Sequence, residues 1–300
     1  MPGSIPASAS VEPAPASAWR RIRARTGLSA GLLILAIIVA MAILAPLLTP
    51  YDPYKQDLLH RRMPPVWHAW LWDDDTASAA HPLGTDKVGR DTWTRLLFGA
   101  RISLIVGFTT ALVSGAIGTA IGIAAGYWGG RIDLVASFLI QSRLAMPIIL
   151  VALAAVSLFG ASLTVIIAVA SLLLWDRAAI VARSTAQQLR QRDFVRAARA
   201  LGATDLRIIC TEILPNLAAG LTVVLTLEMG NAILLEAALS FLGLGVRPPA
   251  ASWGLMLAEA KEDIFFAPWA ITIPGCALFL LVLSVSLVGD GLRGIRRNEI

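Results

Sequence analysis

Two glutamates lie inside an otherwise apolar run of the sequence, where an ionised side chain is costly. Glu228 falls near the middle of the run 214–240, Glu236 follows eight residues later on the same helical face, and Asn231 is close to that face. A carboxylate at the centre of a bilayer costs about 2.5 kcal/mol or more, so it normally faces protein or a water-filled path. Glu228, Asn231 and Glu236 are therefore predicted to line a hydrated path, where they meet an ammonium group or backbone amides. The alternative for Glu228 is a hydrogen bond to a neighbouring helix.

Other side chains that could bind a metal or act in catalysis lack the spacing or the partners that such sites need. The histidines lie in one hydrophilic stretch, and His60 and His68 with Asp73–Asp75 lack the tight spacing of a metal site, so solvated loop residues are expected. Gly160-Ala161-Ser162 resembles the nucleophile turn of an intramembrane serine protease, but no histidine lies in an apolar run to act as the base. The ATP-binding pattern GxxxxGK followed by Ser or Thr is absent from the sequence. We expect no catalytic residue, cofactor or metal in this chain.

The elements that position these residues are unusually apolar. Of the 300 residues, 57% are hydrophobic and 15% are charged, whereas a soluble domain has about 25% charged residues. The net charge of +5 comes from arginines clustered between apolar runs, without the soluble basic face that nucleic-acid binding uses. The composition predicts an integral membrane protein whose solvent is the lipid bilayer, with no nucleic-acid partner.

Apolar runs long enough to cross a bilayer, which takes about 20 residues, recur along the chain. They cover residues 28–48, 102–126, 134–158, 163–183, 214–240 and 268–290. Small residues near Ala42 and Ala45 resemble the cleavage site of a secretory signal, but the first run exceeds the usual apolar length of about 7–15 residues. We therefore expect an all-α fold with six transmembrane helices, the first of them uncleaved.

The charges flanking the first run set the expected topology. Arg20, Arg21, Arg23 and Arg25 precede it, and basic residues favour the cytoplasmic side. An even number of spans then places both termini in the cytoplasm. Asp91–Ile102 is predicted to form an amphipathic helix at the outer membrane surface, anchored by Trp93 and Phe98. The expected divisions are a disordered cytoplasmic tail (1–27), a first transmembrane helix (28–49), an extracytoplasmic segment (50–100), a five-helix core (101–292) containing a cytoplasmic loop (193–215), and a cytoplasmic tail (293–300).

Three glycines in the second apolar run are spaced by four residues. Gly118, Gly122 and Gly126 therefore share one helical face. Without side chains they allow another helix to approach closely. That helix belongs either to this chain or to a second membrane subunit, and the sequence leaves both alternatives open.

The cytoplasmic loop 193–215 is predicted to form a helix–turn–helix. A helix through Leu201 would stop at Gly202, which readily takes the left-handed conformation. Thr204 can cap a second short helix with Asp205 in its first turn. Pro215 falls at the start of the fifth span, where its missing N–H costs little.

One face of the first loop helix is suited to a partner. It carries Phe194, Ala197, Ala198 and Leu201. The two alanines leave room for a partner to come close. The alternative is a surface amphipathic helix without a partner.

Residues of this loop resemble a known docking element. The run Ala197-Ala198, Gly202 and Ile213-Leu214-Pro215 resembles the EAA loop of bacterial ABC import permeases, which docks into a groove of the ATPase. Arg196 stands where the family has glutamate, which changes the charge of the contact. The resemblance implies an ATPase-coupling loop formed by Phe194, Arg196, Ala197, Ala198, Leu201, Gly202, Ala203, Thr204, Asp205, Ile213, Leu214 and Pro215.

Three further segments carry the same resemblance. His81-Pro-Leu-Gly-Thr-Asp-Lys-Val-Gly-Arg-Asp91 and Gly126-Tyr-Trp-Gly-Gly-Arg-Ile-Asp133 look like two motifs of peptide-importer permeases. A third similar stretch runs from Glu236-Ala-Ala-Leu-Ser-Phe-Leu-Gly-Leu-Gly245 through Pro248-Pro249 to Ser252-Trp253-Gly254. The similarity covers about residues 28–292 and fits the DppC/OppC-type subunit of dipeptide and oligopeptide importers. Nickel importers share much of the pattern.

The resemblance implies a type I ABC importer permease in the cytoplasmic membrane. Its expected partners are a homologous second permease, two ATP-binding-cassette ATPases and an extracytoplasmic solute-binding protein. The expected substrates are di- and oligopeptides, with nickel or another small solute as the alternative. Glu236 is expected near the outer interface, where gating or packing is favoured over substrate contact. A secondary transporter is the rival class, but the sequence lacks an inverted repeat and has few spans.

Overall fold

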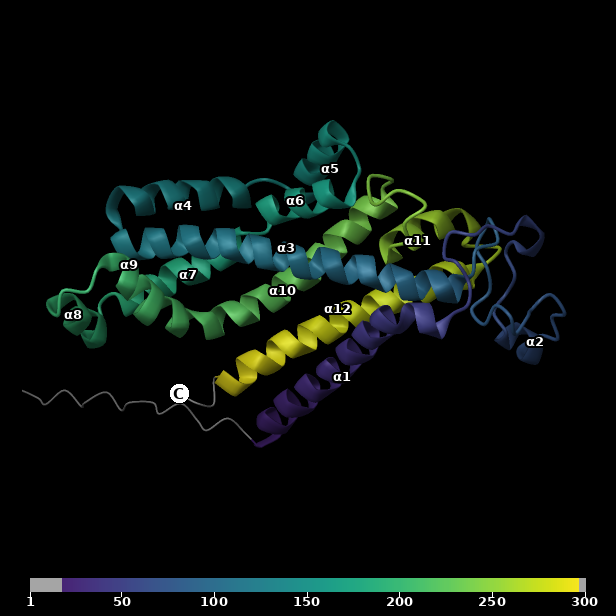
Figure 1. Ribbon diagram of the computed structural model, residues 1–300, viewed down its shortest axis with the longest axis horizontal. Helices are drawn as coiled ribbons and strands as arrows, with labels where there is room; N and C mark the ends of the chain where they lie inside the picture. Colours follow the sequence, from purple (N-terminus) through teal and green to yellow (C-terminus); the bar gives the residue numbers. More distant parts are fainter. Residues whose placement is uncertain (1–17, 297–300) are drawn as a thin grey trace, which may run out of the picture.

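The computed structural model describes residues 18–296, and these residues form an elongated bundle of helices (Figure 1). The fold is all-α, as predicted; within the described residues the only extended pairing is an isolated bridge between Thr85 and Asp91. The α-helices are α1 (Ala18–Leu48), α2 (Trp67–Leu71), α3 (Thr92–Trp128), α4 (Gly130–Leu144), α5 (Ile148–Phe159), α6 (Leu163–Leu173), α7 (Asp176–Leu189), α8 (Asp193–Ala200), α9 (Asp205–Ile208), α10 (Leu214–Phe241), α11 (Trp253–Ala260) and α12 (Pro268–Arg296). Short helical turns lie at Leu58–His60 and Lys261–Asp263, and a π-helical turn lies at Ile209–Ile213.

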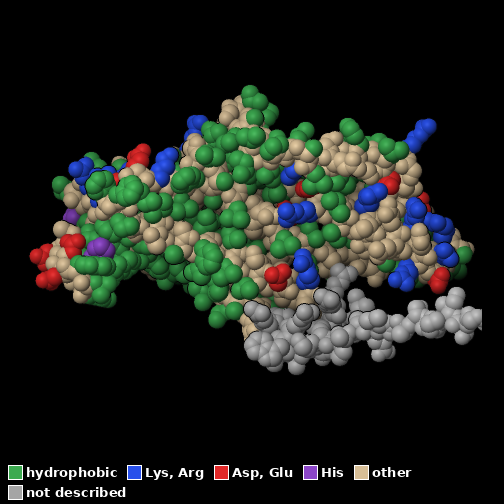
Figure 2. Space-filling model, turned by 180° about the vertical axis from the view of Figure 1, so that it is seen from behind, with side chains coloured by type: hydrophobic (Ala, Val, Ile, Leu, Met, Phe, Trp, Pro, Cys, Tyr) green, Lys and Arg blue, Asp and Glu red, His purple; other side chains and the backbone are tan. Residues whose placement is uncertain are grey.

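Five helical segments among the described residues are long and apolar enough to cross a membrane, and α4 with α5 makes a sixth if this bent pair is one span. The five are α1, α3, α6 joined to α7, α9 joined to α10, and α12. Figure 2 shows hydrophobic side chains over much of the middle of the molecule, with many charged side chains toward its two ends. This arrangement is typical of a helical bundle whose middle part is surrounded by lipid.

The third predicted span is not a straight helix. The axes of α4 and α5 meet at 88° across a short break, and α5 stands away from the bundle in Figure 1. Pro147 lies in the break. Proline has no N–H to donate and disfavours helical geometry at the preceding residue, here Met146. The apolar run 134–158 is therefore divided into two half-helices.

The beginning of α3 corrects the expected surface helix over Asp91–Ile102. Asp91 caps α3, its Oδ2 accepting from Thr94 N at 2.7 Å. The following turns are buried rather than interfacial, since Leu97 is fully buried and Trp253 Nε1 donates to Leu96 O at 2.8 Å. This segment forms the first turns of the second span because α11 packs over it.

The ends of the chain also differ from the expected tails. Helix α1 already begins at Ala18, inside the predicted disordered tail, and residues 1–17 of that tail lie outside the described residues. Helix α12 continues to Arg296, and residues 297–300 of the predicted C-terminal tail likewise lie outside. The two end helices pack against each other; a Cβ added at Gly31 would lie 2.9 Å from Ser284 O.

Candidate functional site

The loop between α7 and α10 has the predicted helix–turn–helix geometry. Helix α8 ends at Ala200, and Gly202 takes a positive φ of 83°. The turn is closed by Gly202 N donating to Arg199 O at 3.0 Å and Ala203 N donating to Ala198 O at 3.1 Å. Thr204 caps α9, its Oγ1 accepting from Arg207 N at 3.4 Å.

The inner face of this loop is anchored on the bundle. Val195, Ile208 and Ile213 are fully buried in one cluster with Tyr127 and Ala186. Ile213 was expected from the sequence to belong to the loop, but Val195 and Ile208 were not, because their burial depends on α3 and α7, which are distant in sequence. The cluster holds both loop helices against the bundle.

The outer face of the loop is apolar and open. Phe194, Leu201 and Leu206 are 41%, 89% and 71% exposed. The Arg196 side chain beside them is 70% exposed, with only a 3.9 Å approach to Asp193. Exposed large apolar side chains gathered on a short rigid element are typical of a protein contact.

Pro215 lies at the start of α10, as predicted, and the loop runs into α10 as a continuous helical segment. Helix α9, the π-helical turn and α10 form one segment from Asp205 to Phe241. Pro215 is within the first two residues of α10, directly after the π-helical turn Ile209–Ile213. A wider turn accommodates the missing proline N–H. Movement of α9 is thereby linked directly to α10.

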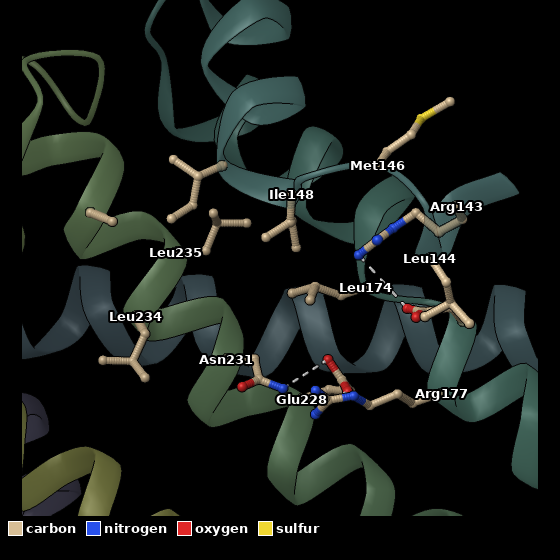
Figure 3. A pocket seen from close by; sticks show the side chains of 13 residues that line it. Arg143, Leu144, Met146, Ile148, Leu174, Arg177, Glu228, Asn231, Leu234 and Leu235 are labelled. Atoms are coloured by element: carbon tan, nitrogen blue, oxygen red, sulfur yellow. Dashed lines mark hydrogen bonds and ion pairs between the residues drawn. The ribbon is translucent and has the colours of Figure 1, made fainter. Parts of the chain in front are cut away.

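A second feature is a cavity of about 380 Å³ at the break between α4 and α5 (Figure 3). Its walls include apolar residues from α5 and α10. Its polar lining is contributed by Arg143, Asp176, Arg177, Glu228 and Asn231. The cavity thus brings together ionisable groups from α4, α7 and α10 in the middle of the apolar bundle.

Glu228 has its countercharge on another helix. Arg177 Nη1 lies 3.4 Å from Glu228 Oε1, and Asn231 Nδ2 donates to Glu228 Oε2 at 3.3 Å. Figure 3 shows Asn231 and Arg177 on either side of the Glu228 carboxylate. Arg143 approaches Asp176 at 3.8 Å and also donates to Leu173 O. Arg143 therefore pairs with Asp176, whereas Arg177 turns toward Glu228.

Glu236 lies elsewhere and does not line this cavity. Its Oε1 accepts from Ser240 Oγ at 2.7 Å and from Ser252 Oγ at 2.8 Å. Ser252 also caps α11 by accepting from Leu255 N at 3.1 Å. Glu236 therefore joins α10 to α11, so the structure brings Glu228 and Asn231 together and leaves Glu236 apart.

The glycine face of α3 packs within this chain. Cβ atoms added at Gly118, Gly122 and Gly126 would collide with carbonyl oxygens at Trp175, Ala179 and Arg183, along α7 and its N-terminal cap. The same positions meet Ala178, Ala182 and Ala186, which repeat at the same spacing of four. Two small-residue faces therefore interlock, and of the two alternatives the contact inside the subunit is the one observed.

A largely buried cluster of charges lies at the end of α3 opposite the loop 193–215, and it was not expected from the sequence. Arg90 lies 2.6 Å from Asp86 and 2.9 Å from Glu259, while Arg95 lies 2.6 Å and 2.7 Å from the same two carboxylates. Burial lowers the pKa of the Arg90 guanidinium, but the neighbouring carboxylates outweigh it and the pKa is raised. Asp86 and Arg90 belong to a recognised motif, whereas Glu259 on α11 is too distant in sequence to be connected with them. We call these four residues the outer clasp.

The residues considered for a metal site are separated. His60 pairs with Asp57, and His68 packs against the rings of Trp72 and Trp269. Over residues 18–296 no group of three or more His, Cys, Asp or Glu side chains is placed to hold a metal ion.

Comparisons with known proteins assign this arrangement to a family. The profile of the family described as binding-protein-dependent transport system inner membrane component matches residues 118–295. The N-terminal TM domain of oligopeptide transport permease C matches residues 16–65. In fold, the chain is similar to an inward-facing MetNI methionine ABC transporter, with a TM-score of 0.55 and 18% identity, covering 69% of this chain and 97% of that one.

Relatives of known name are similar over nearly the whole chain. The dipeptide transport system permease protein DppC of Haemophilus influenzae is 38% identical, covering 92% of this chain and 91% of that protein. The di/tripeptide transport system permease protein DppC of Pseudomonas aeruginosa is 40% identical, covering 92% and 89%. The glutathione transport system permease protein GsiD of Pectobacterium atrosepticum is 36% identical, covering 92% and 88%. The chain belongs to the binding-protein-dependent transport inner membrane component family, as a DppC/OppC-type ABC importer permease subunit of the type I fold.

Proposed function

We propose that this subunit, paired with a homologous second permease, forms the membrane pathway of an importer for di- and oligopeptides. The relatives' names support a peptide substrate, since they specify dipeptide, di/tripeptide and glutathione transport. In this proposal the chain performs no catalytic step. ATP is hydrolysed by two partner ATPases, and an extracytoplasmic solute-binding protein delivers the peptide.

The cavity at the α4–α5 break carries this proposal. It presents a buried carboxylate, Glu228, beside a guanidinium, Arg177, whose side chain is 58% exposed. A peptide zwitterion carries an ammonium and a carboxylate, so both ends find an opposite charge there. Because an exposed guanidinium repels a bare cation, Arg177 favours a peptide over the alternative, nickel or another small cationic solute.

In this proposal the loop 193–215 couples ATP binding by the ATPases to movement of the permease. ATP binding draws the two ATPases together, and the loop docked on one of them moves with it. Since α9 continues into α10, which carries Glu228, this movement reaches the cavity. The permease pair then passes from inward-facing to outward-facing because ATP binds one state more tightly than the other. Both termini and this loop lie in the cytoplasm in this proposal.

The test is reconstitution of both permeases, the ATPases and the binding protein in liposomes, with ATP inside or outside. We expect ATP-dependent uptake of a radiolabelled dipeptide and none of radioactive Ni²⁺. Arg177→Gln should reduce peptide uptake while leaving the complex assembled. Uptake of nickel in place of peptide would overturn the substrate assignment, and uptake without ATP would overturn the transporter class. The ligand that co-purifies with the binding protein gives an independent identification.

A further inference from the structure

The end of α3 is tied to the coupling loop by one side chain, Tyr127. Its hydroxyl donates to Asp205 Oδ1 at 2.6 Å and accepts from Arg199 Nη2 at 2.9 Å. The backbone carbonyl of Tyr127 accepts from Arg190 Nη1 at 2.9 Å. A phenol can donate one hydrogen bond while accepting another, so both hydroxyl contacts are made at once.

The partners of Tyr127 come from each part of the loop. Arg190 follows α7, Arg199 lies on α8, and Asp205 begins α9. The Arg199 guanidinium also lies over the Tyr127 ring, 5.7 Å from its centre. Tyr127 is 4% exposed and belongs to the buried cluster beneath the loop. Tyr127 therefore meets both loop helices from α3.

The other contacts of α3 allow a displacement at Tyr127 to be transmitted along the helix. Gly118, Gly122 and Gly126 bring α3 against α7 without intervening side chains, so these two helices form a rigid pair. Helix α3 is 37 residues long and reaches from the loop to the outer clasp. A displacement of the loop that is held by Tyr127 is therefore carried along α3 to the opposite side of the membrane.

We propose that the Tyr127 hydroxyl is a positioning group that transmits movement of the coupling loop to α3. This inference rests on the proposed role of the loop 193–215 as the ATPase contact. Movement of the loop would then reach the membrane-spanning helices in two ways: through Tyr127 to α3, and through the continuous helix from α9 to α10. The Tyr127–Asp205 hydrogen bond is charge-assisted, which suits it to transmit force in both directions of the cycle.

The test compares Tyr127→Phe with a control, Tyr54→Phe, which removes a hydroxyl from the exposed segment between α1 and α3. Both variants are reconstituted as the full transporter, and peptide imported per ATP hydrolysed is measured with the thermal melting of the complex. Tyr127→Phe keeps the buried ring, so melting should stay at the parent value. The peptide-to-ATP ratio should fall about fivefold or more, whereas Tyr54→Phe should retain the parent ratio.

A second pair of variants tests the same hydrogen bond from its exposed side. The side chains of Arg199 and Asp205 are 55% and 52% exposed, so Asp205→Ala is compatible with folding. It should lower the ratio as Tyr127→Phe does, and the double variant should show no further loss. Asp205→Asn, which retains an acceptor, should restore most of the ratio.

The outcomes separate this inference from the proposed function. A parent-like ratio in Tyr127→Phe, with uptake abolished by Ala198→Asp, would overturn the inference alone. Lower melting with an unchanged ratio would also overturn it, because Tyr127 would then serve stability only. Full uptake in Ala198→Asp would instead overturn the proposed role of the loop.

Discussion

Arg177 Nη1 and Glu228 Oε1 lie 3.4 Å apart, joining an exposed guanidinium on α7 to a carboxylate that is 1% exposed on α10. Glu228 Oε1 accepts no hydrogen bond within the described residues. The Arg177–Glu228 contact is thus an electrostatic ion pair without a hydrogen bond to Glu228 Oε1. A carboxylate or an ammonium entering the cavity could separate the two partners, which makes the pair a candidate recognition element.

Glu228→Gln retains the size of the side chain and removes its charge. If the ion pair recognises substrate, uptake per assembled complex should fall by about tenfold, which corresponds to about 1.4 kcal/mol. Assembly should be unchanged, because the amide oxygen of the new side chain would still accept from Asn231. The contrasting variant is Glu236→Leu, which loses the contacts to Ser240 and Ser252 and should reduce the amount of complex instead. Parent-like uptake in both Glu228→Gln and Glu228→Leu would remove Glu228 from the pathway.

Gly202→Pro should abolish uptake while the protein remains in the membrane. Gly202 has a φ of 83°, which proline cannot adopt, so the turn between α8 and α9 would be displaced. Ala198→Asp should act similarly, because Ala198 packs against the buried cluster beneath the loop and a charge there would be unpaired. The matched control is Ala200→Asp, an exposed position two residues along α8. Transport that survives both Gly202→Pro and Ala198→Asp would show that the loop is not the ATPase contact.

Cysteines at Asp74 and Gln191 should report opposite sides of the membrane. The native Cys210 and Cys276 are both exposed, so they are first replaced by serine. A membrane-impermeant thiol reagent applied to intact cells should label position 74 and not position 191, and permeabilisation should allow labelling of both. Equal labelling in intact cells would exclude the proposed orientation.

Gly122→Ala should destabilise the subunit by about 1–3 kcal/mol, the usual cost of overpacking a tight contact. The new Cβ would collide with Ala179 O and lie 2.6 Å from Ala182 Cβ. Gly230→Ala is the control, since its Cβ would meet only Val285 Cγ1 at 3.9 Å. Thermal melting of the purified complex should separate the two variants, and equal melting would contradict the interlocked packing of α3 and α7.

Glu259→Ala should destabilise the outer clasp by about 3–5 kcal/mol, because it leaves the buried Arg90 and Arg95 with one partly buried carboxylate, Asp86. Glu262→Ala nearby is the control, as its partner Lys87 lies at 3.3 Å and the Glu262 side chain is 68% exposed. Protease resistance of the segment between α1 and α3 in proteoliposomes provides the measurement. Similar resistance in the two variants would count against a stabilising clasp.

Local patterns were predictable from the sequence because they depend on neighbouring residues. The turn at Gly202, the cap at Thr204 and the apolar spans all follow from short-range propensity and hydropathy. The partner of Glu228 and the outer clasp were not predictable, because Arg177 and Glu259 reach their partners only after distant helices pack. The break at Pro147 had a local signal, but its run is apolar on both sides and hydropathy alone did not reveal the bend.

The 88° break between α4 and α5 also bears on which side of the subunit is expected to face its partner permease. Each helix end leaves backbone groups without partners in the helix, and hydrocarbon supplies none. A pair of such ends at membrane depth is tolerated only against protein or water. We therefore expect the side bearing the break to face the partner permease, and the exposed Leu33 and Ile43 of α1 to face the acyl chains. On this expectation, Pro147 sets which side of the subunit faces its partner.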